Sequence, residues 1–313
     1  MSSTACALGW AFRPRRLKRM LHHHHSSPQN PARVVVLGAG GFIGGAILQR
    51  LRAAGLATSA LGRPSLDLLA PHAAADLASA LQPHDTLVFV SAKAPVKSPA
   101  MLLENLRMAE VVCAALQRQP VRHVVYLSSD AVYKDSPDPL REDSCAEPGS
   151  MHGVMHLARE VMLRAAHDGP TAFIRPTLVY GVADPHNGYG PNRFRRLAAE
   201  GKEIVLFGEG EERRDHVAVE DVAELTLRVC LHRSSGTVNA TSGEIVSFRE
   251  LAEFCAGQFP SRITVRGSPR SGPMPHNGYR AFAPSAALAA FPGFQFMRWR
   301  DGLARNCAAT KPA

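Results

Sequence analysis

The chain alternates between two patterns of hydrophobic and polar positions. Short continuous apolar runs are typical of strands buried on both faces of a parallel sheet, and apolar residues spaced three or four apart are typical of amphipathic helices. The first pattern predicts strands over Arg33–Leu37, Thr58–Leu61, Asp85–Ala92 and Val121–Ser128. The second predicts helices between them, over Ile43–Ala54, Ala73–Leu81 and Met101–Gln117. This alternation predicts an α/β protein with a doubly wound parallel sheet.

The composition changes after about Thr177. Residues 182–215 and 257–280 are rich in glycine, proline and arginine, which is typical of loops and short elements. We therefore expect a first domain over residues 33–176 and a smaller C-terminal α/β lobe over residues 177–305. Some elements of the second range are expected to return to the first domain.

The net charge of +9 is concentrated at the N-terminus. Residues 1–33 hold six of the 36 basic residues and no acid, so the remainder has 30 basic against 27 acidic residues, or +3. So small an excess gives no support to a nucleic-acid partner. Residues 1–32 end in a stretch rich in Ser, Pro and Asn, and we expect a disordered basic tail, although its arginines and lack of acids also resemble a transit peptide.

The apolar runs and the cysteines indicate the cellular location to expect. No apolar run reaches the roughly 18 residues that a membrane-spanning helix needs. The six cysteines are scattered, with no C-x-x-C pair. A chain of this length needs no disulfides for stability, so reduced thiols, a cytoplasmic location and no membrane partner are expected.

A glycine-rich turn follows the first strand and opens the first helix. Gly38, Gly41 and Gly44 stand around Phe42 and Ile43. Glycine permits a tight turn and lets the backbone approach a pyrophosphate, while the helix N-terminus offers unpaired N–H groups. Strand, turn, helix and the later alternation agree, so we predict an NAD(P)-binding Rossmann-type domain over residues 33–176.

The second strand indicates which dinucleotide binds. An acidic residue about 20 positions after the turn usually binds the adenosine ribose and selects NAD, but no acid precedes Asp67. Arg63 stands at the end of the strand instead, where a guanidinium can bind the 2′-phosphate of NADP. We therefore expect NADP, with NAD as the other option and Asp67 at the adenine end. Arg63 as a solvated loop residue remains the alternative.

Four further motifs follow in order. They are Asn105 in a helix, S-S-x-x-V-Y from Ser128, R-P-x-x-V-Y-G from Arg175, and G-x-G-x-x-x-R-D-x-V-x-V-x-D-V-A from Gly208. With the glycine turn, they resemble the extended short-chain dehydrogenase/reductase superfamily, in particular its NAD-dependent epimerase/dehydratase family, from about Arg33 to Leu303.

That resemblance implies a cofactor domain followed by a lobe that binds a nucleotide sugar. It places Arg214, with Asn192 and Arg193 upstream, where the family holds the substrate diphosphate. A guanidinium suits this role because its planar fork meets phosphate oxygens bidentately. Pairing of Arg214 with a neighbouring glutamate is the alternative.

The family's catalytic residues are only partly present. Ser129 matches the serine, but the expected Y-x-x-x-K reads His152 and His156. In one interpretation His152 performs acid/base chemistry, since imidazole titrates near neutral pH, and His156 keeps the hydrogen bonds to the cofactor ribose. Lys93 could replace the lost charge, although a solvated loop lysine is as good an explanation.

Two other interpretations stay open. The protein could bind cofactor and ligand without turnover, as a regulatory or scaffold protein. The i, i+4 histidines could also chelate a metal, but the sequence shows no third ligand, and no metal is expected. We expect an NAD(P)-dependent oxidoreductase, epimerase or dehydratase acting on a nucleotide sugar or related phosphorylated polyol. The resemblance also implies a homodimer formed through the helices Met101–Gln117 and Gly153–Ala166.

Overall fold

A computed structural model describes residues 20–63 and 65–310 of the chain, and its largest element is a six-stranded parallel sheet. The strand order is β2-β1-β3-β4-β5-β9. The bounds are β1 Arg33–Leu37, β2 Thr58–Leu61, β3 Asp85–Phe89, β4 His123–Leu127, β5 Thr171–Pro176 and β9 Gly236–Ala240. The order reverses between β1 and β3, and ligands of such sheets bind beyond the carboxyl ends of the strands at this point. The predicted doubly wound α/β fold is confirmed.

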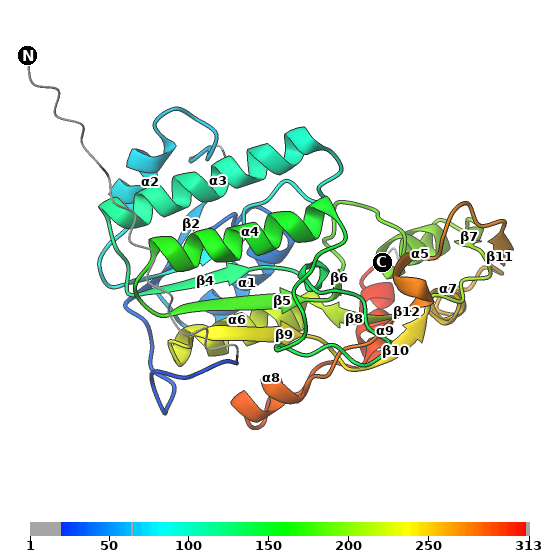
Figure 1. The fold of residues 1–313 in the computed structure, drawn as a ribbon. Coiled ribbons are helices and arrows are strands. Elements are labelled where there is room, and N and C mark those ends of the chain that lie inside the picture. Colours follow the sequence, from blue (N-terminus) through cyan, green and yellow to red (C-terminus); the bar gives the residue numbers. More distant parts are fainter. Residues whose placement is uncertain (1–19, 64, 311–313) are drawn as a thin grey trace, which may run out of the picture.

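Helices cover both faces of this sheet (Figure 1). One layer holds α2 Ala73–Ala80, α3 Pro99–Arg118 and α4 Met151–Ala166, and the other holds α1 Phe42–Ala53 and α6 Val219–Leu231. Alternate residues of β1 enter the two cores, with Val34 and Val36 in one and Val35 and Leu37 in the other. A strand buried on both faces has no polar position, which explains its continuous apolar run.

A smaller lobe lies beyond one end of the sheet (Figure 1). Its strands are β6 Leu178–Tyr180, β7 Ile204–Phe207, β8 Arg213–Ala218, β10 Ile245–Ser247, β11 Val265–Ser268 and β12 Tyr279–Arg280. Its helices are α5 Pro191–Ala199, α7 Phe248–Gly257 and α9 Trp299–Ala308. Phe194, Leu251 and Trp299 join these helices in a core of their own. Within residues 177–305, α6, β9 and α8 Ser285–Ala290 pack with the large sheet instead.

Several element ends differ from the sequence prediction. The strand expected to reach Ala92 ends at Phe89, because the N–H groups of Val90 and Ser91 both donate to the Leu37 carbonyl and turn the chain. The helix expected from Met101 begins at Pro99, where the Ser98 hydroxyl accepts the Met101 N–H. Both differences arise from hydrogen bonds that the hydrophobic pattern does not encode.

Residues 20–32 are not a disordered tail. Met20 and His22 form bridges with Thr237 and Ser235 beside β9. The His23 ring bonds to the Ser234 hydroxyl and the Ala290 carbonyl, both at 2.8 Å. This segment covers an edge of the sheet that would otherwise offer unpaired backbone groups. The expectation of disorder is therefore wrong for residues 20–32, and residues 1–19 lie outside the described residues.

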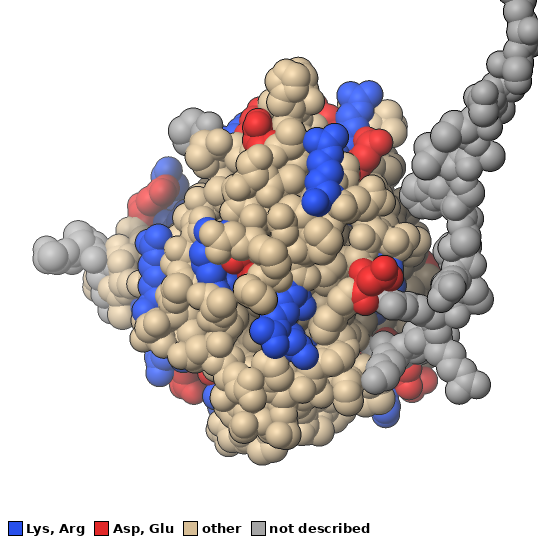
Figure 2. All heavy atoms as spheres, turned by 90° about the vertical axis from the view of Figure 1, so that its left-hand side faces the viewer, with Lys and Arg blue, Asp and Glu red and all other residues tan. Residues whose placement is uncertain are grey.

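Charges are mixed on the face shown in Figure 2, where basic and acidic side chains lie among each other. Within residues 20–63 and 65–310, no helix has the length and apolar character needed to cross a membrane.

Candidate functional site

A cavity of about 1160 Å³ lies between the carboxyl ends of the main strands and the small lobe. The β1–α1 turn, the segments after β3 and β4, and the start of α4 line one part of it. Thr177, Arg214 and Arg280 line the part toward the lobe. A volume above the range of roughly 300–1,000 Å³ typical of single small-molecule sites leaves room for two ligands side by side.

The glycine turn forms the floor of this cavity. Gly38 has φ +101°, and a Cβ on Gly44 would collide with the Gly38 carbonyl oxygen. A Cβ on Gly40 would meet no atom within 4 Å, so the space in front of the turn is open. Gly41 caps α1 without any side-chain hydrogen bond. The first N–H groups of a helix have no partner within it, and Phe42 and Ile43 line the cavity, so this geometry fits a pyrophosphate.

Arg63 and Asp67 follow β2 and line the same cavity. Both side chains are exposed, and Asp67 accepts the Leu69 N–H at 3.0 Å. The structure thus brings the two residues predicted for the adenosine end to the β2 side of the glycine turn.

Helix α4 carries the two histidines and is held by buried contacts. Ser150 caps it, and a Cβ on Gly153 would collide with the Ala131 carbonyl, so the helix approaches closely to the segment after β4. Farther along, Glu160 binds Arg175 of β5 through two contacts, at 2.8 and 2.7 Å, and accepts the Ser128 hydroxyl at 2.7 Å. The glutamate therefore fixes α4 against β4 and β5.

Burial would raise the pKa of the Glu160 carboxyl. The hydrogen bond and charge of Arg175, aided by Arg164 and Ser128, outweigh burial and leave this pKa below its ordinary value of 4.5. Glu160 is thus ionised at neutral pH. Its role is structural, since its partners are protein groups.

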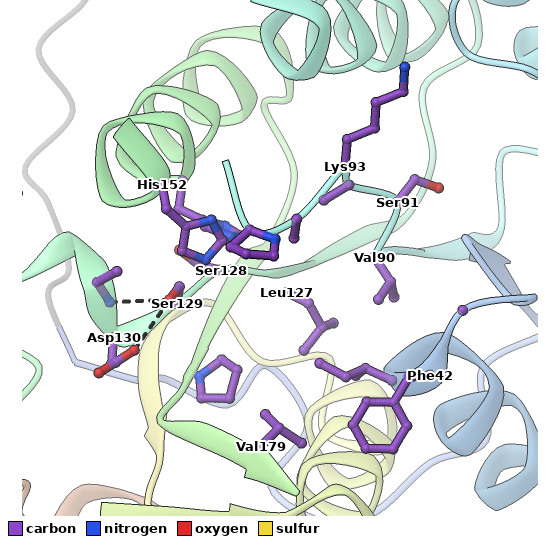
Figure 3. Close-up of a pocket in the computed structure, with 18 of the residues that line it drawn as sticks. Phe42, Val90, Ser91, Lys93, Leu127, Ser128, Ser129, Asp130, His152 and Val179 are labelled. Carbon is purple, nitrogen blue, oxygen red and sulfur yellow. Dashed lines mark hydrogen bonds between the residues drawn. The ribbon is translucent and has the colours of Figure 1, made fainter. Parts of the chain in front are cut away.

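His152, Ser129 and Asp130 meet where α4 begins and β4 ends (Figure 3). Ser129 accepts the Ala131 N–H at 3.1 Å and lies 3.3 Å from the Asp130 carboxylate. Burial lowers the pKa of His152, the charge of Asp130 opposes this, and the net shift is downward. His152 is therefore largely neutral at pH 7, and its Nδ1 is buried without a hydrogen-bond partner among the described residues.

His156 lies deeper, one helical turn from His152. The two rings meet edge to face with centroids 4.7 Å apart. His156 Nδ1 and the Tyr126 hydroxyl are 2.8 Å apart. Burial, followed by the charges of His152 and Arg159, lowers the pKa of His156 well below 6.5. In the described part of the chain, no group of three His, Cys, Asp or Glu residues could hold a metal, so the structure adds no third ligand to this pair.

Three residues were expected to hold the substrate diphosphate, and one of them lines the cavity. Arg214 lines the cavity, with one nitrogen 3.0 Å from Glu212. Asn192 does not line it, because its side-chain oxygen accepts the buried Gly181 N–H at 3.0 Å. Arg193 is exposed on α5, away from the cavity. The structure therefore brings Arg214 to the cavity lining but not Asn192 or Arg193.

Arg280 is a cavity residue that the sequence did not indicate. It is 2% exposed, and its guanidinium contacts Asp130, Asp135 and the Tyr133 carbonyl. It comes from the two-residue strand β12, which pairs with β8 beside Arg214. So short a strand leaves no periodic pattern, so only the tertiary pairing reveals this second cation.

Lys93 does not replace the missing charge. Its ammonium pairs with Glu104 at 2.9 Å, and Figure 3 shows the side chain pointing away from His152.

Comparison with known proteins agrees with the fold. The model of the NAD dependent epimerase/dehydratase family matches residues 34–241. UDP-glucose 4-epimerase of Mycolicibacterium smegmatis is 30% identical over 266 residues, which cover 72% of this chain and 82% of the relative.

Two solved structures share the fold. UDP-glucose 4-epimerase of Thermus thermophilus in complex with NAD has a TM-score of 0.75 at 23% identity, over 89% of this chain and 98% of that one. A GDP-L-fucose synthetase from Naegleria fowleri bound to NADP has a TM-score of 0.76 at 15% identity, over 90% and 94%. From its motifs, its fold and these matches, the chain belongs to the NAD dependent epimerase/dehydratase family.

Proposed function

We propose that this protein is an NAD(P)-dependent enzyme that acts on a nucleotide sugar, with His152 as its acid/base residue. The observation that carries the proposal is the meeting of His152, Ser129 and Asp130 inside one cavity that also contains the glycine turn. Membership of the family supports the substrate class.

The proposed chemistry begins at a substrate hydroxyl. Neutral His152 takes the hydroxyl proton as the carbon–hydrogen bond breaks, and the imidazolium returns it when the reaction runs in the other direction. Asp130 stabilises that imidazolium, because a nearby carboxylate favours the charged form. The nicotinamide, when bound, accepts or supplies the hydride.

Ser129 positions the substrate oxygen. Its own oxygen already accepts the Ala131 N–H, so its hydroxyl proton is available for the substrate. The 3.3 Å contact to Asp130 is long for an O–H···O hydrogen bond and is readily exchanged.

We propose Arg214 as the cation that holds the substrate diphosphate, because the donors of Arg280 are engaged by Asp130, Asp135 and the Tyr133 carbonyl. Glu212 engages one terminal nitrogen of Arg214, and the other side-chain donors of Arg214 have no hydrogen-bond partner among the described residues. For the cofactor, the dinucleotide phosphates would lie over the turn from Gly38 to Gly44. Arg63 favours NADP, since its exposed guanidinium follows β2 at the place where a 2′-phosphate would lie.

We further propose a homodimer through α3 and α4, which lie side by side on one face of the sheet (Figure 1). Leu103, Val154 and Val161 are exposed on these helices by 57%, 42% and 52%. Exposed apolar groups gathered on neighbouring helices are typical of an interface. Sedimentation analysis tests this, and a protein that stays monomeric at high concentration contradicts it.

The test of function uses purified protein, each dinucleotide and a panel of GDP- and UDP-sugars, with nicotinamide absorbance and product analysis as readouts. His152→Phe should lower kcat by about 10²–10⁴-fold, the usual contribution of a general acid/base, with little change in cofactor Kd. His84→Phe, at an exposed position outside the cavity, is the matched control. Full activity in His152→Phe would exclude His152 as the acid/base residue. Tight cofactor binding without turnover of any sugar would exclude the proposal that the protein is an enzyme acting on nucleotide sugars.

A further inference from the structure

A buried polar chain lies behind the cavity and ends at His156. The Tyr126 side chain is fully buried, and its hydroxyl is 2.8 Å from His156 Nδ1. His156 is 6% exposed and lines the cavity with its other edge. The contact comes from β4 on one side and α4 on the other, so the packing of helix on sheet fixes it.

Arg159 lies next to this pair and has an unusual environment. Its side chain is fully buried. Its guanidinium donates to the carbonyls of Asn105, at 3.0 and 2.6 Å, and Ser91, at 2.9 Å, and to the Asn105 side-chain oxygen at 3.0 Å. Asn105 is itself held by the backbone of Lys93. All hydrogen-bond acceptors of Arg159 in the described part of the chain are thus neutral.

A buried guanidinium without a carboxylate is costly to maintain, and its field reaches the neighbouring groups. Burial raises the pKa of Tyr126 to about 12, while the charge of Arg159 and a hydrogen bond from it act in the opposite direction. Arg159 has donors only and can accept nothing from the tyrosine. The single proton of the Tyr126 hydroxyl is therefore directed to His156 Nδ1, its remaining partner among the described residues.

We propose that Tyr126 and Arg159 are positioning residues that hold His156 as the neutral tautomer protonated at Nε2. Tyr126 occupies Nδ1 as a donor, and Arg159 opposes a second proton on the ring. His156 Nε2–H then becomes a fixed donor toward the cavity. Arg159 supplies, from behind, the permanent positive charge that His156 cannot carry.

The use of that donor rests on the proposed function: Nε2–H would bind a ribose hydroxyl of the cofactor. The tautomer itself does not depend on turnover. The charged and titratable groups around the ring are His152 and Arg159 on α4 and Tyr126 on β4, with Asp130 facing His152.

The tautomer can be read directly from ¹⁵N spectra of the histidine rings at neutral pH. In the unaltered protein His156 should be protonated at Nε2 alone. In Tyr126→Phe both tautomers should appear, and NADP or NAD should bind about three- to tenfold more weakly, the effect of one hydrogen bond. Tyr133→Phe is the matched control: it removes a buried hydroxyl that donates to Asn239 at 2.7 Å, and the His156 tautomer should not change.

Arg159→Met tests the charge. The pKa of His156 in an NMR titration should rise in this variant. In Arg159→Lys the pKa should return part of the way to its lower value in the unaltered protein. If Arg159 variants do not fold, the spectrum of the unaltered protein and of Tyr126→Phe still decides the outcome. A proton on Nδ1 in the unaltered protein, or an unchanged tautomer in Tyr126→Phe, overturns the proposal. Absence of turnover bears only on the proposed function, because the spectra do not require it.

Discussion

Replacement of Glu160 by Gln tests whether buried charge holds α4 on the sheet. Glu160 is 0% exposed and contacts Arg175, Arg164 and Ser128. The Arg175 side chain is only 5% exposed, so removing the carboxylate leaves its buried guanidinium without its ion-pair partner. Breaking a buried pair from one side costs about 3–5 kcal/mol. We expect Glu160→Gln to lower the free energy of unfolding by that amount at pH 7.

The pH dependence gives a second, independent readout. Because the folded-state pKa of Glu160 lies below its ordinary value of 4.5, its stabilising effect is present above pH 4.5 and disappears as the pH falls through the folded-state pKa. The stabilities of the unaltered protein and of Glu160→Gln should therefore converge as the pH falls through the folded-state pKa of Glu160. A difference that grows on acidification would contradict the sign of this shift.

Urea denaturation followed by circular dichroism measures both effects. Glu203→Gln is the control, because it breaks the exposed pair with Arg266, and exposed pairs contribute about 0–1 kcal/mol. A loss below about 1 kcal/mol for Glu160→Gln at pH 7, equal to that of the control, would refute the reasoning.

Three further predictions concern the ligands. Arg63→Ala should weaken NADP about tenfold and NAD hardly at all, since a charged hydrogen bond to the 2′-phosphate contributes about 1.5 kcal/mol; equal losses in a fluorescence titration would exclude selection by Arg63. Gly44→Ala should abolish binding of both dinucleotides, because its Cβ collides with the Gly38 carbonyl, and unchanged Kd values would show that the turn adapts. Arg214→Gln should raise the KM for the nucleotide sugar at least tenfold while cofactor Kd stays constant, if the cation binds the diphosphate. Glu212→Gln, which frees the guanidinium, should not raise that KM.

The sequence by itself determined the class of fold and the first ligand site. Apolar runs such as Val34–Leu37 identify strands buried on both faces, because such strands have no exposed position to fill with polar residues. Gly38, Gly41 and Gly44 identify the turn at the end of β1, because collisions and a positive φ exclude a side chain at two of them. The substitution of His152 and His156 for the expected tyrosine and lysine was also visible directly.

Only the tertiary structure decided which polar residues share the site. Asn192 and Arg193 match the substrate motif, yet Asn192 bonds to the Gly181 N–H, Arg193 is exposed, and neither lines the cavity. Arg280 reaches it from a two-residue strand far along the chain. Residues 20–32 look like a polar tail, but bridges at β9 order them. Their polar composition is compatible with either state, because those bridges bond backbone groups.

The environment of His152 and His156 shows most clearly what the sequence determined and what the tertiary structure decided. The sequence places His152, His156 and Arg159 on successive turns of one helix, which sets their spacing but not their partners. The partner of His156 is Tyr126, 30 residues earlier, and the acceptors of Arg159 lie on Asn105 and Ser91. Charge state and tautomer depend on burial and on neighbours at about 3 Å, and these exist only after helix and sheet have packed.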